Sequence, residues 1–441
     1  MSAKNATSAR SAISESAVLK KVTRRLLPFI GICYIILYLD RTNIGVAALQ
    51  MNDELAISAS AFGFAAGVYF WSYTLCEPFS NYILTRIGTR VWISRIMITW
   101  GLVTIATAAV SNEFWLIIAR VLLGFAEAGF SPGMLYFVSR WFPAARRGVA
   151  MSWIVSFICL SGLLTPLLTG ILDSFDGLGG LSGWRWLFIL TGIPAVAMGI
   201  IFYAVIRNTP REAKFLEPAE REWLQGVIDQ EDAQNAHTAH NFSAGIRAAR
   251  VWVLISVFIC VTFSLNGLQI WFPQMLAALG FPSPAIGWVA ALPSLVAIVP
   301  MVLWNRHSDK TGERPGHFVA AACVAALGFA VAALTVHTPA VAVAAFCVAA
   351  IGIYSAMAVF ITMPSSFLAG AALAAGFGLI NGLGNIGGYL GPQVTGWIKD
   401  LTGEFSAAIL VFGGAMALAA VITGLLWRST RNTTKRASVE A

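Results

Sequence analysis

The chain has 441 residues, of which 58% are hydrophobic and only 11% are charged. This composition excludes an ordinary soluble globular protein, and the stretches 251–305 and 315–398 contain no Asp, Glu, Lys or Arg. Each stretch exceeds the roughly 20 residues that span a bilayer, so each must cross it more than once. We therefore expect an all-α membrane protein with many spans.

The net charge of +8 comes from basic residues at the ends of apolar segments. That placement is typical of membrane topology, so we expect a lipid bilayer and no nucleic acid as the partner surface. The six cysteines are scattered through apolar segments without metal-ligand spacing, which predicts neither disulfides nor a metal site. Residues 1–25 are polar and basic, so no cleaved signal peptide is expected.

Segments that can span a bilayer occur in two sets of six, one on each side of a polar segment. In chain order they cover residues 26–49, 59–84, 91–110, 114–138, 148–172, 185–206, 251–275, 283–304, 317–336, 340–365, 371–396 and 405–427. The sequence therefore predicts twelve transmembrane helices in two six-helix bundles, with these parts: a tail at 1–25, bundles at 26–206 and 251–427, a central loop at 207–250 and a tail at 428–441.

The distribution of Lys and Arg predicts the orientation. Most of the 29 basic residues fall in the two tails, in the central loop, or after the second, fourth and eighth segments. Basic residues favour the cytoplasmic side, so we expect both termini in the cytoplasm. Within the central loop, residues 217–232 predict a charged, moderately amphipathic helix on that surface, with a docking role as the alternative.

The two halves share a matching loop. Residues 81–90 follow the second segment and residues 305–314 follow the eighth, with every matched position displaced by 224 residues. Parallel repeats related by an axis along the membrane normal place such loops on the same side. The residues expected to form gating loops are Arg86, Gly88, Arg90, Asp309, Gly312 and Arg314.

These loops resemble the signature of the major facilitator superfamily, Gly-x-x-x-Asp-Arg/Lys-x-Gly-x-Arg. The first copy departs from it at Asn81 and Thr85, and the second has Asn305 for the leading glycine but keeps Asp309. The resemblance implies the major facilitator fold.

Two further runs narrow the resemblance. Tyr38-Leu-Asp-Arg-Thr-Asn-Ile-Gly and the run from Arg120 to Pro132 are similar to the anion:cation symporter family. The run that begins Glu77-Pro-Phe-Ser-Asn is most similar to the tartrate, phthalate and hydroxyphenylacetate permeases of that family. The role of Glu77 itself, as a gate, a brace or a proton carrier, stays open.

Four charged residues lie inside apolar segments: Asp40, Arg41, Arg120 and Glu127. A charge at the bilayer centre costs roughly 2.5 to 3.5 kcal/mol, so such groups face a cavity or pair. Arg120 and Glu127 share a helix face but stand ~10 Å apart, so a bound carboxylate, Asp40 or water must complete the network. A static ion-pair network that locks the helices together is the alternative to a functional site.

The chemistry of these groups suggests a division of roles, which the resemblance supports. Arginine keeps its charge and presents a planar fork that fits a carboxylate, so Arg41 and Arg120 are expected to bind an anion. Burial and a neighbouring arginine act in opposite directions on the proton affinity of a carboxyl group, so Asp40 and Glu127 are expected to exchange protons.

Polar and aromatic side chains are expected to complete the binding site. Tyr38 lies three residues before Arg41, so both face the same way, and Tyr73 supplies a second phenol. Asn381 and Asn385 are four residues apart on one helix face, although a neighbouring helix could equally satisfy such amides. The second half offers no charge, and we expect it to contact the neutral part of a substrate.

We therefore expect a secondary transporter that imports a small organic anion, an aromatic or hydroxy carboxylate, with protons. An exchanger or exporter, and a membrane sensor that does not transport, are the alternatives. The run Gly129-Phe-Ser-Pro-Gly matches the GxSxG pattern of hydrolases but lies in an apolar helix, so no enzyme is expected. No cofactor is expected, and the protein should be a monomer in the plasma membrane, the inner membrane if bacterial.

Overall fold

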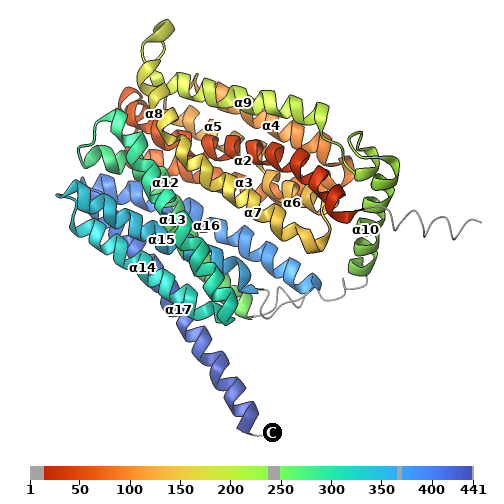
Figure 1. The fold of residues 1–441 in the computed structure, drawn as a ribbon. Helices are drawn as coiled ribbons and strands as arrows, with labels where there is room; N and C mark the ends of the chain where they lie inside the picture. The colour runs from red at the N-terminus through yellow and green to blue at the C-terminus, as the bar shows by residue number, and fades with distance from the viewer. Residues whose placement is uncertain (1–13, 237–248, 365–369, 440–441) are drawn as a thin grey trace, which may run out of the picture.

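The computed structural model describes residues 14–236, 249–364 and 370–439, and the regular elements within these ranges are all helical (Figure 1). Parts of four predicted regions lie outside the described residues: 1–13 of the N-terminal tail, 237–248 of the central loop, 365–369 of the second bundle and 440–441 of the C-terminal tail.

The first half forms one bundle, drawn from red to yellow-green in Figure 1. Its helices are α2 (Glu15–Glu54), α3 (Ala59–Ile87), α4 (Thr89–Thr107), α5 (Glu113–Glu127), α6 (Phe130–Trp141), α7 (Ala144–Ser161), α8 (Thr165–Ser174) and α9 (Gly183–Val205). A short 3-10 turn, η1 (Gly162–Leu164), joins α7 to α8.

The second half forms the other bundle, drawn from green to blue. Its helices are α12 (Ala249–Ala278), α13 (Ser283–Thr311), α14 (Arg314–Leu334), α15 (Pro339–Thr362), α16 (Gly370–Thr402) and α17 (Ser406–Val439). Counting α5–α6 and α7–α8 as one broken helix each, the chain forms the twelve expected spans. The bounds of α3 and α13 differ by 224 residues at both ends, so the repeat seen in the loops extends to the helices.

Eight of the spans are long and apolar enough to cross a membrane by length and composition alone, among the described residues. The spans that fall short of this measure are α3, α4, α7–α8 and α16. Three of them, α3, α8 and α16, contact the opposite bundle. Contact between the bundles is not the whole reason, because α2, α12 and α13 also contact the opposite bundle and still meet the measure.

Along the chain, α10 (Pro218–Ala236) comes between the two bundles and is the helix expected in the central loop; in space it lies at one end of the first bundle (Figure 1). It is held against the first bundle by charge: Lys21 donates a 2.7 Å hydrogen bond to Glu220, and Arg147 donates a 2.9 Å bond to Glu231. The backbone N–H of Ala144, at the start of α7, also donates to Glu231 at 2.9 Å. We call this side of the molecule the α10 face and the opposite side the far face.

The two bundles meet at the far face. The Asp400 carboxylate at the end of α16 accepts hydrogen bonds from the backbone N–H groups of Ala59 (3.1 Å) and Ser60 (2.8 Å), at the start of α3. Ser283 of α13 donates to Asp173 of α8 at 2.7 Å. These polar contacts close the ends of the bundles on this side.

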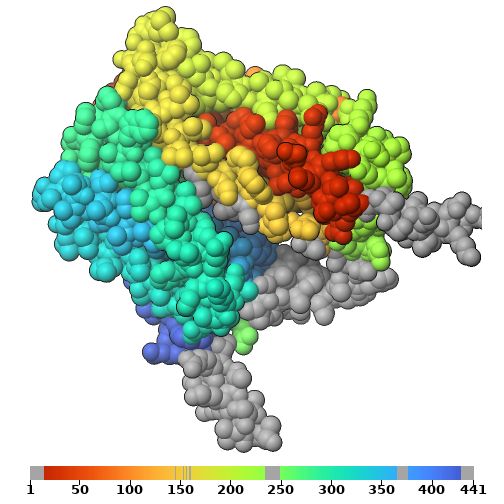
Figure 2. Space-filling view, viewed as in Figure 1, coloured from red at the N-terminus to blue at the C-terminus, as the bar shows by residue number. Residues whose placement is uncertain are grey.

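Small residues bring the helices together just below these contacts. A Cβ atom at Gly45 of α2 would lie 2.5 Å from the carbonyl oxygen of Ile270 in α12. At Gly63 of α3 it would lie 2.5 Å from the carbonyl oxygen of Pro392 in α16. Nearer the α10 face, Figure 2 shows a hollow between α7 (yellow) and α13 (teal), with part of α16 (blue) inside it. The structure is therefore closed at the far face and hollowed between the bundles.

The glycine seam leads to a first prediction. Gly63→Ala places a methyl group against the Pro392 carbonyl, which α3 and α16 can relieve only by separating, at a cost of about 1–3 kcal/mol to the closed far face. Spin labels at the exposed residues Glu113 and Leu401, on opposite bundles, should report a longer distance in this variant. Gly170→Ala is the control, because nothing lies within 4 Å of a Cβ there. An unchanged distance in both variants would contradict the role of the seam.

Candidate functional site

An ion pair between α2 and α5 forms the centre of the site. The Nε and Nη2 atoms of Arg41 donate to Oε1 of Glu127 at 2.8 and 2.6 Å. The Glu127 side chain is fully buried, whereas the Arg41 side chain is 28% exposed. The second carboxylate oxygen of Glu127 has no hydrogen-bond partner among the described residues. Arg41 therefore binds a buried carboxylate while part of its own side chain stays accessible.

A break in the helix follows Glu127 directly. The predicted span 114–138 is not continuous, because α5 ends at Glu127 and α6 begins at Phe130. Gly129 adopts a φ of +88°, and a Cβ atom there would lie 2.1 Å from Oγ of Ser80 in α3. Ser80 donates a 2.6 Å hydrogen bond to the Ala128 carbonyl, which has no helical partner because Pro132, four residues on, lacks an N–H. Glycine and the α3 serine thus hold the end of α5, and Glu127 with it.

Asp40 faces other helices than its neighbour Arg41. Its Oδ1 accepts a 2.8 Å hydrogen bond from Thr104 of α4 and a 3.1 Å bond from Asn43, one turn along α2. Asn43 also donates to Thr191 of α9 at 3.1 Å. Asp40 is fully buried, and its Oδ2 has no partner among the described residues. This carboxyl group therefore lies inside the first bundle, held by neutral donors.

Three tyrosines surround the Arg41 guanidinium. The centroids of the Tyr38, Tyr69 and Tyr73 rings lie 5.7, 5.9 and 5.6 Å from its Cζ atom. The Arg120 guanidinium, 3% exposed, lies over the Tyr69 ring at 4.9 Å. Within the described ranges no carboxylate forms an ion pair with Arg120, and its Nε has no hydrogen-bond partner. One arginine is thus paired and the other is held by an aromatic face.

The six first-half residues predicted for the site therefore come together, and the structure supplies the partner that the sequence left open. Glu127 pairs with Arg41, an arrangement that neither helix spacing nor residue order predicts. The predicted Asn381 and Asn385 lie half-buried on α16. Asn385 is one turn from Tyr389, whose ring lies 6.0 Å from Trp71 of α3, so this side of α16 faces the first bundle.

Three residues of the cluster, Asn43, Tyr69 and Thr104, are not predicted from the sequence. Tyr69 lies four residues before Tyr73, and that spacing is a signal that could have found it. Thr104 gives no such signal, because threonines in helices commonly bond their own backbone, as Thr107 does with Val103 at 2.9 Å.

A neutral polar cluster lies in the second half. Gln269 of α12 donates to the hydroxyl of Tyr354 in α15 at 3.2 Å, and Ser294 of α13 lies 3.4 Å from the same hydroxyl. All three side chains are half-buried. The second bundle therefore presents amide and hydroxyl groups where the first presents charge.

The predicted gating loops contact their own bundles. Gly88 and Gly312 end α3 and α13 with positive φ values of +93° and +67°, but their ψ values of 156° and 2° make the two turns different. Arg90 donates to the Tyr203 carbonyl at 2.7 Å, and Arg314 donates to the Thr362 carbonyl at 2.6 Å. The side chains of the other two predicted residues, Arg86 and Asp309, are exposed.

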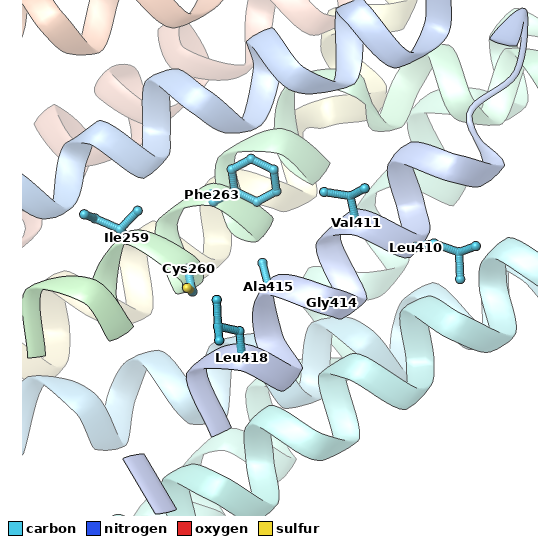
Figure 3. A pocket seen from close by; sticks show the side chains of 8 residues that line it. All are labelled: Ile259, Cys260, Phe263, Leu410, Val411, Gly414, Ala415 and Leu418. Carbon is cyan, nitrogen blue, oxygen red and sulfur yellow. The ribbon is translucent and has the colours of Figure 1, made fainter. Parts of the chain in front are cut away.

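A groove between α12 and α17 is unrelated to this cluster (Figure 3). It has a volume of ≈ 530 Å³, and its lining residues are Ile259, Cys260, Phe263, Leu410, Val411, Gly414, Ala415 and Leu418. It contains no charged side chain and exposes leucines such as Leu418, which is 52% exposed. Its chemistry suits hydrocarbon and not an anion.

The chain resembles known proteins over most of its length. The family described as "Major Facilitator Superfamily" matches residues 30–369 and 254–441. A putative tartrate transporter of Agrobacterium vitis is 40% identical, with 94% of this chain and 96% of that protein covered. The putative metabolite transport protein NicT of Pseudomonas putida is 36% identical, covering 94% and 96%.

The fold is also found among solved structures. The xylose transporter XylE from E. coli, in a partially occluded inward open conformation, aligns with a TM-score of 0.73. The alignment covers 92% of this chain and 97% of that one at 16% identity, so the likeness concerns the fold alone.

The Asp40 network yields a second prediction. Thr104→Val removes a donor from a fully buried carboxyl group and should lower the free energy of unfolding by about 1.5–3 kcal/mol. Thr107→Val is the matched control, because Thr107 is equally buried but bonds only its own helix, and its loss should stay below about 1 kcal/mol. Unfolding by SDS in mixed micelles measures both, and equal losses would show that Thr104 does not support Asp40.

Proposed function

The chain belongs to the major facilitator superfamily and is a multi-pass membrane transporter, and from this premise we propose that it imports a small organic anion together with protons. The observation that carries the proposal is the Arg41–Glu127 ion pair, in which Arg41 is 28% exposed and Glu127 is fully buried. Beside it lies Arg120, which has no carboxylate partner in the described chain. Two cations and a buried carboxyl group are the parts that such a cycle requires.

The arginines account for the anion. A guanidinium offers a planar fork of donors that matches a carboxylate, and Arg120 has a buried Nε without a partner. The putative tartrate transporter, similar over 96% of its length, supports a carboxylate as the substrate. Tyr38 and Tyr73 line the Arg41 guanidinium, and Asn381 and Asn385 of α16 are proposed to contact the neutral part of the molecule.

The carboxyl groups account for the proton. Glu127 uses one oxygen for Arg41 and leaves the other without a partner, so that second oxygen can take up a proton. A protonated Glu127 no longer neutralises Arg41, whose guanidinium becomes available to the substrate carboxylate. Asp40, bonded by neutral donors only, provides the second proton site. The proton removes the negative charge of Glu127, and the substrate carboxylate supplies a new negative charge beside Arg41. Binding of the proton therefore favours binding of the anion, and the two are carried together.

Access changes by movement of the two bundles. With the α10 face in the cytoplasm, as the basic residues predict, this structure is the inward-facing state, closed outside by the Asp400 and glycine contacts. The gating loops Arg86–Arg90 and Asp309–Arg314 lie on the inner side. We propose a monomer in the plasma membrane, or the inner membrane of a bacterium.

Proton coupling is tested in proteoliposomes. Tartrate should accumulate when the outside is acidic, with each pH unit adding about 1.4 kcal/mol per proton, close to tenfold. Asp40→Asn should abolish accumulation but preserve exchange of labelled for unlabelled tartrate, because the anion site is intact. Glu404→Gln, a change at an exposed carboxylate, serves as the control. Uptake that ignores the proton gradient in the wild type would sink symport and favour an exchanger.

Anion binding is tested at Arg120. Arg120→Met keeps most of the side-chain volume but removes the charge, so the KM for tartrate should rise about 10- to 150-fold, the range for losing a charged hydrogen bond. A thermal-shift comparison of aliphatic and aromatic carboxylates, with their neutral amides as controls, reports the same loss. If amides stabilise the wild type as well as the acids do, the substrate is not an anion.

A further inference from the structure

Tyr69 lies against both arginines of the site. It is on α3, its side chain is 2% exposed, and its ring centroid lies 4.9 Å from Cζ of Arg120 and 5.9 Å from Cζ of Arg41. Aromatic rings attract cations through the negative charge of their faces, most strongly where water is absent. A single ring therefore contacts the two cations that are proposed to bind substrate.

The two arginines depend on this ring to different degrees. Arg41 has the Glu127 carboxylate and two more rings, from Tyr38 and Tyr73. Arg120 has no carboxylate partner within the described part of the chain. Like charges repel strongly in a medium of low dielectric constant, so two guanidinium groups in one site gain from an aromatic ring within reach of both. Tyr69 is such a ring, and Arg120 depends on it more.

The Tyr69 ring is itself held in place. Its edge-on neighbour Phe70 lies at 5.1 Å and Tyr73 at 5.9 Å, both measured between ring centroids. The backbone carbonyl oxygen of Tyr69 accepts a 3.0 Å hydrogen bond from Ser72. The same oxygen lies against α5, because a Cβ atom at Gly124 would be only 2.5 Å from it. Gly124 is one turn from Arg120, so the close α3–α5 contact sets the ring relative to that arginine.

We propose that Tyr69 is a positioning residue that holds the Arg41 and Arg120 guanidinium groups as one anion site. This inference rests on the proposed function, because it names how that site is kept in shape. Among the described residues the Tyr69 hydroxyl makes no well-formed hydrogen bond, and the Glu127 carboxylate interacts with it, so the hydroxyl can serve Glu127 or the substrate. The ring carries the larger effect, since it contacts both cations, and the hydroxyl a smaller one.

Two variants separate the ring from the hydroxyl. Tyr69→Leu removes both and should raise the KM for tartrate about 30-fold, with a much smaller change in kcat, because two cation contacts are lost. Tyr69→Phe keeps the ring but loses the hydroxyl, and it should raise the KM for tartrate about threefold. Phe202→Leu is the control: Phe202 of α9 is equally buried but packs on Phe29 at 5.7 Å, and its loss should leave KM within about twofold.

Three outcomes would overturn the inference. If Tyr69→Leu binds tartrate as well as the wild type does, or no worse than Tyr69→Phe does, the ring does not position the arginines. If Phe202→Leu raises KM as much as Tyr69→Leu does, general packing explains the loss.

A measurement without ligand separates this inference from the proposed function. In SDS unfolding, the losses of stability caused by Tyr69→Leu and Arg120→Met should be non-additive. The unfolding equilibrium constant of the double variant should be about tenfold smaller than the sum of the two single losses predicts. Additive effects would refute the contact even if transport is confirmed. If the wild type takes up no carboxylate but the two changes are coupled, the proposed function fails and the role of Tyr69 in holding Arg120 stands.

Discussion

The burial of charge in the first bundle is the constraint on which the site depends. A charged side chain inside the membrane must find a partner or face water, and here the Arg41–Glu127 pair does both. The break after Glu127, the glycine that permits it and the Ser80 hydroxyl that caps it all hold this carboxylate in reach of α2. The break between α5 and α6 therefore helps to place Glu127 for its ion pair with Arg41.

The two halves share a fold but not a chemistry. At the repeat distance of 224 residues, Asp40 and Arg41 correspond to Ser264 and Leu265, so the second bundle has no charge at the equivalent place. It presents instead the Gln269–Tyr354–Ser294 cluster and the α16 amides. The two halves thus share helix bounds and a loop pattern, while only the first carries charge at this place.

The glycine contacts that close the far face lie near the charged cluster, on α2 and α3. Gly45, which contacts α12, is one turn beyond Arg41, and Gly63 lies on α3 less than two turns from Tyr69. Movement at this seam therefore shifts α2 and α3, the helices that carry Arg41 and Tyr69. This proximity gives a physical route by which a change of charge in the site can bias which face is open.

Sequence alone determined the helical class, the twelve spans, the internal repeat and the four charged residues of the site. These properties are local: apolar length defines a span, and a charge within it stands out against hydrocarbon. The tertiary structure decided which charges pair. Asp40 and Arg41 are neighbours in the chain, yet one bonds Thr104 of α4 and the other Glu127 of α5. Helix rotation, the break at Gly129 and the approach of α3 to α5 decide those contacts, and they depend on packing between segments far apart in the chain.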